Sequence, residues 1–387
     1  MPSNDPLAMR KPDKDDPPSL HMRRLRDAPF DTLQRLIDEF GHRPATSLAE
    51  ARAAALLDGR LRRAGLQVIA DTFSAIPEPG WVGMILGLLA CGALLAYYWL
   101  PLLTLGLAAV LALLATIALL RPRFLSGMPR PSQNVVGNRA ASDQQHYRLV
   151  LLARIDTPLA PAILTRALGG QHIMRMRLVA TLVFGLLAII GLFDPQRLWL
   201  YLLALPALYL AAAALHDVLA ARPLGATHPK DSAGIAVLLA ASEQLDALEH
   251  TELWAIGLGA TARGAGLSDV LRRYPFDSAK TLFVALEGLG SGAPAIVSTE
   301  GWPRSLPADP QLAEALATIT QDPQDSALSI ASPTPTLAST LLQDGRRAIS
   351  IACFGPQSET VPDMEQEHLE RATRIVIALA RAIDQWG

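Results

Sequence analysis

Four long apolar stretches constrain this chain more than any other feature of its sequence. They are Trp81–Leu100, Leu102–Leu120, Leu178–Phe193 and Leu198–Leu215. No charged residue interrupts them, and a helix needs about 20 residues to cross the hydrocarbon core of a bilayer. The third stretch is short, but a helix that begins near Met174 would span, because arginine side chains reach out to the headgroups. The stretches predict four transmembrane helices; the alternative is a set of helices buried in a soluble core.

The predicted helices form two hairpins whose ends differ in charge. Pro101 separates the first pair and residues 194–197 separate the second, and these tips carry one arginine, Arg197. Near the opposite ends lie Arg121, Arg123, Arg130, Arg166, Arg175, Arg177 and Arg222. Because positively charged loops stay in the cytoplasm, we expect a multi-pass protein of the inner (plasma) membrane with both termini and the soluble mass in the cytoplasm. The lack of ionisable residues within the stretches argues against a transport path.

Outside the hairpins, the sequence predicts one soluble domain that is interrupted twice. The pieces are too small to be separate domains, and a hairpin returns the chain to the side of the membrane that it left. Loop-closure entropy also rises only slowly with loop length, so such insertions are tolerated. The predicted division is a disordered tail (1–29), three parts of the soluble domain (30–78, 122–173 and 218–387) and two membrane hairpins (79–121 and 174–217).

The soluble parts alternate between apolar strand patterns and helical patterns. Strands are predicted at Gln67–Phe73, Ser132–Gly137, Tyr147–Ala153, Glu252–Leu258, Thr281–Leu286 and Ala348–Cys353. Helices are predicted at Phe30–Phe40, Ala51–Ala64, Ala233–Leu245, Arg263–Tyr274, Gln311–Thr318 and Glu365–Gln385. Ser47, followed by Glu50 three residues later, is a candidate capping box for the second helix. Strands that alternate with helices indicate an α/β fold with a sheet covered on both faces.

This order of segments resembles metallopeptidase family 28, the co-catalytic dizinc aminopeptidases. The resemblance begins at 41–47 (GHRPATS), similar to the family's "G-x-R-x-x-G-S" stretch, and continues through 53–55 and 61–68 (LRRAGLQV). It covers nearly all of the soluble sequence. It implies a three-layer α/β/α domain of the zinc-exopeptidase type with a mixed central sheet, and a dizinc site whose residues can be compared position by position.

The first two metal-binding motifs of the family are altered. The family's "H-x-D" corresponds to Arg154-Ile155-Asp156, so a guanidinium replaces the histidine ligand and the supporting aspartate is kept. A guanidinium stays protonated and offers no lone pair to zinc. The family's "D-N-A-S-G" corresponds to residues 230–234 (KDSAG), which places Lys230 in the bridging-carboxylate position. A one-residue shift would place Asp231 there instead, and both alignments stay open.

The remaining motifs are altered as well. Thr261 and Ala262 stand at the two glutamates of "E-E-x-G", which the resemblance identifies as the general base and a metal ligand. Glu287 is a conservative replacement in "N-x-D", and Glu359 replaces the histidine of "H-T-x-x-D". We therefore predict no catalytic residue, no metal and no cofactor, with zinc as the alternative. His228 could still hold a single metal ion with the nearby carboxylates, although a loop histidine in solvent is the default.

The charges of the replaced positions balance. Arg154 and Lys230 contribute two positive charges, and Glu287 and Glu359 contribute two negative charges. We expect these four side chains to form a salt-bridge cluster where the metals would lie, since pairing makes partly buried charge tolerable. The alternative is that they are ordinary solvated side chains on a shallow surface.

The sequence thus predicts a catalytically inactive, aminopeptidase-like membrane protein. Its expected role is that of a binding, structural or assembly subunit of a membrane complex, because losing the general base and most ligands removes water activation. The expected partners are other membrane subunits and the lipid bilayer, with a peptide in the family's substrate cleft as a further ligand. A net charge of −2 argues against nucleic acid. The alternatives are a membrane-bound metallo-aminopeptidase or amidase with altered metal ligands, and a lipid-binding or membrane-shaping protein.

Overall fold

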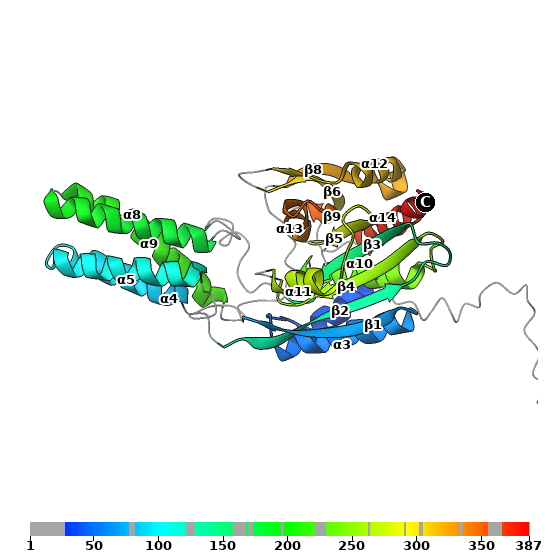
Figure 1. Ribbon diagram of the computed structural model, residues 1–387, viewed down its shortest axis with the longest axis horizontal. Helices are drawn as coiled ribbons and strands as arrows, with labels where there is room; N and C mark the ends of the chain where they lie inside the picture. Colours follow the sequence, from blue (N-terminus) through cyan, green and yellow to red (C-terminus); the bar gives the residue numbers. More distant parts are fainter. Residues whose placement is uncertain are drawn as a thin grey trace, which may run out of the picture.

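A computed structural model gives the architecture of the chain. It describes residues 28–76, 82–120, 128–157, 168, 173–194, 197–220, 230–261, 264–289, 292–301, 305–332, 336–354 and 366–386. Nearly all of the predicted N-terminal tail lies outside these residues. In Figure 1 the described chain forms two parts, a soluble α/β domain and an elongated bundle of helices beside it.

A mixed sheet forms the centre of the soluble domain (Figure 1). Its strands are β1 (Gln67–Ala75), β2 (Arg130–Arg139), β3 (Tyr147–Arg154), β4 (Thr251–Leu258), β5 (Thr281–Leu286), β6 (Ala293–Glu300), β7 (Leu306–Pro307), β8 (Leu328–Ser332) and β9 (Arg347–Phe354). Their order is β1-β2-β4-β3-β5-β9-β6-β7, and β8 pairs with β6. The strands β4, β3, β5 and β9 are parallel, and β1–β2, β2–β4, β9–β6 and β6–β7 are antiparallel pairs. β8 runs parallel to β6.

Helices cover both faces of the sheet. They are α2 (Pro29–Arg35) with the π-helical turn η1 (Leu36–Phe40), α3 (Leu48–Arg63), α10 (Lys230–Gln244), α11 (Ala265–Arg273), α12 (Pro310–Ile319), the short turn η4 (Pro323–Asp325), α13 (Leu337–Gln343) and α14 (Gln366–Asp384). Alternate residues of β3 separate the two cores, because successive strand side chains point to opposite faces. Leu149 and Leu151 pack with α2, α3, α10, α12 and α14. Val150 and Leu152 pack with α11 and α13. The soluble domain therefore has three layers.

The predicted strands and helices are present, and the structure adds elements that the sequence pattern did not reveal. β6, β7, β8 and α13 were not predicted: β7, β8 and α13 are short, and β6 follows the glycine-rich segment 288–292 and contains Pro294. The predicted first helix is divided into α2 and η1 at Leu36. The predicted capping serine is confirmed, since the Ser47 hydroxyl accepts a hydrogen bond from the Glu50 amide at 3.1 Å.

The apolar stretches form a separate bundle of four helices: α4 (Val82–Ala96), α5 (Pro101–Leu120), α8 (Ile173–Phe193) and α9 (Arg197–Ala220). Three of them, α5, α8 and α9, are long and apolar enough to cross a membrane. The described part of α4 has 15 residues, so the prediction of four full spans is reduced to three candidates and one shorter apolar helix.

Small residues bring α4 close to α9. A Cβ atom on Gly87 would lie 2.5 Å from the Cβ of Ala214, and one on Gly83 would lie 1.8 Å from a carboxylate oxygen of Asp217. A side chain at Gly87 would therefore force the two helices apart, and one at Gly83 would displace the Asp217 carboxylate. Close approach at small residues is how helices associate in lipid, where no hydrophobic driving force acts between them.

The bundle also contains an ion pair whose two residues lie just beyond the predicted apolar stretches, Leu178–Phe193 and Leu198–Leu215. Because α8 begins at Ile173 and α9 continues to Ala220, Arg177 and Asp217 both lie within the helices. Arg177 Nη2 lies 2.7 Å from Asp217 Oδ1 and also donates to the Ala213 carbonyl at 3.0 Å. His216 Nδ1 lies 3.2 Å from the same carboxylate oxygen. The helices therefore do contain ionisable side chains, and the buried ones, Arg177 and Asp217, are paired.

Candidate functional site

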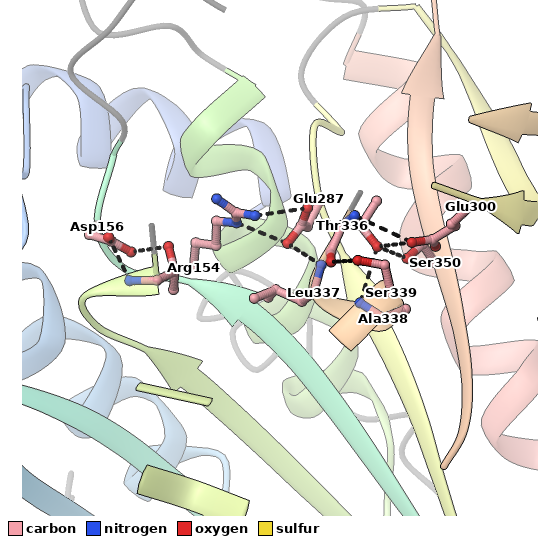
Figure 2. Close-up of polar contacts among 10 residues, drawn as sticks. Arg154, Asp156, Glu287, Glu300, Thr336, Leu337, Ala338, Ser339 and Ser350 are labelled. Carbon is pink, nitrogen blue, oxygen red and sulfur yellow. Dashed lines mark hydrogen bonds and ion pairs between the residues drawn. The ribbon is translucent and has the colours of Figure 1, made fainter. Parts of the chain in front are cut away.

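Arg154 and Glu287 lie side by side because of the strand register. β3 and β5 are parallel neighbours with Ala153 opposite Leu286, so the next residue of each chain reaches the same edge of the sheet. Arg154 Nε donates to Glu287 Oε1 at 2.9 Å, and Nη2 donates to Oε2 at 3.3 Å (Figure 2). A two-pronged contact of this kind is the geometry that favours arginine over lysine. Two of the four side chains that were predicted to form a salt-bridge cluster are therefore bound to each other.

Glu287 connects this pair to helix α13. The Leu337 amide donates to Glu287 Oε1 at 3.0 Å, at the first turn of that helix. The neighbouring Thr336 hydroxyl lies 2.7 Å from Glu300 Oε2 and 2.6 Å from the Ser350 hydroxyl (Figure 2). Burial raises the pKa of Glu300. Two glutamates from different strands thus hold the segment that begins α13, a helix that the sequence analysis missed.

Asp156 and Thr261 form a second contact between former site positions. Thr261 donates its amide to Asp156 Oδ2 at 2.8 Å and its hydroxyl to Oδ1 at 2.7 Å. Both residues are buried, and burial raises the pKa of Asp156. In the family pattern this aspartate supports a histidine ligand and the threonine position belongs to the general base. Here the two side chains bind each other, so both carboxylate oxygens of Asp156 already accept a hydrogen bond.

Glu50 lies beside this contact and joins three segments. Its Oε1 accepts from the Ala260 amide at 2.9 Å and from the Ser132 hydroxyl at 3.0 Å, and its Oε2 accepts from the Thr46 amide at 2.6 Å. Thr46 and Ala260 both have positive φ, 65° and 46°. Left-handed backbone costs a non-glycine residue about 1–3 kcal/mol, so one carboxylate stabilises two strained turns. Burial, with the charge of Asp156, raises the pKa of Glu50 to about 7.

Arg43 is a further site residue whose role sequence reasoning did not find. Its side chain is fully buried and donates to the Ile155 carbonyl at 2.8 Å and to the Ser232 hydroxyl at 2.7 Å. It thereby joins the end of β3 to the first turn of α10, the two segments that carry the first two altered motifs. In the sequence, the only indication of this role was that Arg43 occupies the arginine position of the "G-x-R" stretch.

Not every predicted site residue can be placed. The side chains of Lys230 and Asp231, and the residues Ala262, Glu359 and His228, lie outside the part of the chain that the structure describes. The start of α10 is nevertheless fixed, because a Cβ atom on Gly234 would lie 2.2 Å from the Leu286 carbonyl oxygen. Half of the predicted cluster, the Arg154–Glu287 pair, is therefore present, and its other half stays a prediction.

The described residues of this site do not fit a zinc ion. Zinc sites in proteins use histidine, cysteine and carboxylate ligands. Among the described residues, no group of three such side chains is close enough to hold a metal. Both oxygens of Glu287 and both oxygens of Asp156 are bound by protein donors.

Solved structures with the same fold are aminopeptidases and glutaminyl cyclases, whereas no family model and no curated protein matches the chain. A zinc aminopeptidase from Bacillus subtilis has a TM-score of 0.52 and 10% identity over 92% of this chain and 94% of its own. An Acidobacteriales bacterium glutaminyl cyclase has a TM-score of 0.54 and 13% identity over 98% and 100%. An aminopeptidase from Aneurinibacillus sp. strain AM-1 has a TM-score of 0.52 and 11% identity over 92% and 93%. At these identities the likeness shows the fold: the soluble domain is built like zinc aminopeptidases and glutaminyl cyclases.

Proposed function

We propose that this chain is a catalytically inactive, aminopeptidase-like integral membrane protein that acts as a binding, structural or assembly subunit of a membrane protein complex. The observation that carries the proposal is the Arg154–Glu287 ion pair at the edge of the sheet where the fold's metal site would lie. The shared fold supports descent from a hydrolase, and the altered residues support loss of its chemistry.

The inactivity follows from what dizinc hydrolysis requires. A metal-bound water must be deprotonated, which needs both the metal and a nearby general base. Thr261 has no group that is basic near neutral pH, and its hydroxyl is already bound to Asp156 at 2.7 Å. The Arg154 guanidinium repels a cation instead of binding it. A domain that keeps its fold without this chemistry retains surfaces for binding.

The bundle supports integration into a membrane. Large apolar side chains point outward on its helices, including Leu88, Leu113, Leu186 and Leu205, each more than half exposed. Contiguous apolar surface of this extent is rare on soluble monomers but is what a helix presents to lipid. We assign the protein to the inner (plasma) membrane, with the soluble domain in the cytoplasm, because the arginines gather at the domain's end of the hairpins.

Zinc content and turnover test the loss of catalysis. Protein purified without chelator is analysed for bound metal and assayed on aminoacyl anilides and small amides, with a zinc aminopeptidase as positive control. We expect substoichiometric zinc and no turnover. Stoichiometric zinc, together with turnover that disappears in chelator, would establish the alternative, a membrane-bound metallo-aminopeptidase or amidase with altered ligands.

Extraction in mild detergent tests the proposed role as a subunit. The extracted material is separated by size and its components are identified by mass spectrometry. We expect another membrane protein to co-elute in a constant ratio to this chain, in repeated preparations and at moderate salt. A chain that elutes alone with lipid would instead favour a lipid-binding or membrane-shaping protein.

A further inference from the structure

All the connections between the soluble domain and the bundle leave one edge of the sheet. β1 ends at Ala75, which pairs with Arg130 at the start of β2. β3 ends at Arg154 opposite Leu258, the end of β4, and β2 runs antiparallel to β4. The first turn of α10 lies against Leu286, the end of β5. This edge, which we name the strand-end edge, also carries the Arg154–Glu287 pair, and in Figure 1 it faces the bundle.

Short connections keep the strand-end edge close to the bundle. Six residues (76–81) join β1 to α4, and nine residues (121–129) join α5 to β2. An extended chain covers at most about 3.6 Å per residue, so the shorter connection reaches no further than about 25 Å. The headgroup layer of one leaflet is on the order of 5–8 Å thick. If the bundle spans a bilayer, the strand-end edge must therefore face the lipid headgroups at short range.

The charge of this region is strongly biased. The connecting segments 121–129, 158–172 and 221–229 contain Arg121, Arg123, Arg166 and Arg222 and no acidic residue, whereas the fourth, 76–81, contains Glu78 and no basic residue. Two described arginines beside them, Arg130 and Arg175, are exposed. The acidic groups placed nearby are already occupied, since Glu287 and Asp217 are paired with Arg154 and Arg177. Each arginine near an anionic membrane surface contributes about 1 kcal/mol, or about fivefold in affinity.

We propose that the strand-end edge rests on anionic phospholipid headgroups, with Arg130 and Arg175 as contact residues. This inference builds on the proposed membrane function and adds the orientation of the domain and the chemistry of the lipid. The bilayer is the committed source of the phosphate because the connections hold this edge beside it. A ligand of the Arg154–Glu287 region must then approach along the membrane surface, as a membrane-anchored protein segment does.

A quenching experiment on the full chain tests the orientation. In a background with Cys91→Ser and Cys353→Ala, one fluorophore is attached at S74C, near the strand-end edge, and in a matched variant at Q67C. Both residues are exposed on the same strand, β1, seven positions apart. In nanodiscs that contain a headgroup-linked quencher, we expect the label at position 74 to be quenched severalfold more than the label at position 67. Equal quenching overturns the proposal.

Lipid selectivity tests the chemistry. Nanodiscs are prepared from phosphatidylcholine with phosphatidylglycerol, and the lipid retained by the protein after detergent transfer is analysed. We expect enrichment of phosphatidylglycerol that falls at least fivefold in the double variant R130Q/R175Q and stays unchanged in R381Q, an exposed arginine on the C-terminal helix α14. Unchanged enrichment in the double variant contradicts the inference.

Alkaline carbonate washing of native membranes separates this inference from the proposed function. A chain released by carbonate would not be an integral membrane protein, and the proposed function itself would then fail. A chain that stays in the membrane but shows equal quenching at the two positions refutes only the orientation.

Discussion

Two of the molecule's arginine–carboxylate pairs lie in contrasting surroundings. Arg154 and Glu287 lie at the edge of the sheet with 28% and 13% of their side chains exposed. Arg177 and Asp217 lie inside the helix bundle with 4% and 11% exposed. The first pair is bidentate and also holds the Leu337 amide, whereas the second joins α8 to α9 beneath Gly83. Similar chemistry thus joins two strand ends and helix α13 in one region and two packed helices in the other.

The difference lies in what surrounds each pair when it is broken. Water can reach the Arg154–Glu287 pair and partly solvate the Glu287 carboxylate that remains when Arg154 is removed. The loss of folding stability is therefore smaller. Arg177 has almost no access to water, and its partner carboxylate is enclosed by α4, α8 and α9. An unpaired charge there bears nearly its full desolvation penalty. Breaking the Arg177–Asp217 pair, which we name the bundle pair, is therefore expected to cost more folding stability than breaking the Arg154–Glu287 pair.

The largest expected effect comes from breaking the bundle pair. Arg177→Ala leaves Asp217 charged inside the bundle and should lower the free energy of unfolding by about 3–5 kcal/mol. Thermal unfolding in detergent, followed by helical circular dichroism, measures it. Arg175→Ala is the matched control, because Arg175 is exposed two residues earlier on the same helix. Equal melting temperatures for the two variants would show that the pair is not structurally important.

Helix packing around the bundle pair gives the next effect. Gly87→Ala places a methyl group 2.5 Å from Ala214 and 3.1 Å from the Leu210 carbonyl, so α4 and α9 must separate. Overpacking of this kind costs about 1–3 kcal/mol. Gly92→Ala is the control, since nothing lies within 4 Å of a Cβ atom there. If Gly87→Ala melts no lower than Gly92→Ala in the same detergent, the close contact between α4 and α9 is refuted.

A smaller loss of folding stability is expected when the Arg154–Glu287 pair is broken. Arg154→Ala leaves Glu287 with one hydrogen bond from the Leu337 amide and partial access to water, and should cost about 1–2 kcal/mol. Arg35→Ala serves as control, because Arg35 forms an exposed pair with Glu39 on one helical face. Chemical denaturation of the two variants compares them. Identical midpoints would favour solvated side chains over a structural ion pair at this site.

Local pattern and register account for what the sequence could predict. The β3 residues from Leu149 to Ala153 are buried on both faces, and such short continuous apolar runs are typical of the parallel strands of α/β domains. Once β3 and β5 are known to be neighbours, Arg154 and Glu287 must meet at the same edge. The resemblance indicated which positions belong to one site. The balance of two positive and two negative charges at those positions then predicted a salt bridge.

The rest depends on tertiary contacts that leave no local signal. The role of Arg43 comes from residues 112 and 189 positions away, Ile155 and Ser232. Helix α13 has seven residues and is held at its start by Glu287 and by Thr336, which no periodicity predicts. The bundle pair was missed because Asp217 follows the apolar stretch that ends at Leu215, and only the full length of α9 brings it inside.

The last effect is a slope with pH and concerns the buried carboxylate Glu50, near the Asp156–Thr261 contact. Burial and the neighbouring Asp156 charge raise the pKa of Glu50 to about 7, so the folded protein binds a proton that the unfolded chain releases near pH 4.5. Stability from this group is complete below about pH 4.5 and is lost as pH rises toward 7, by at most about 1.4 kcal/mol per pH unit.

Glu50→Gln should flatten the fall in stability between pH 5 and 7, whatever its effect on the overall level, because glutamine does not titrate. Denaturation midpoints measured across that range give the slope for each protein. The exposed Glu249→Gln serves as control and should keep the wild-type slope. An unchanged slope in Glu50→Gln would mean that Glu50 stays ionised, its three hydrogen-bond donors outweighing burial and the charge of Asp156. In that case Glu50 would resemble Asp217 in the bundle, because both would be buried carboxylates that stay ionised and are held by fixed partners.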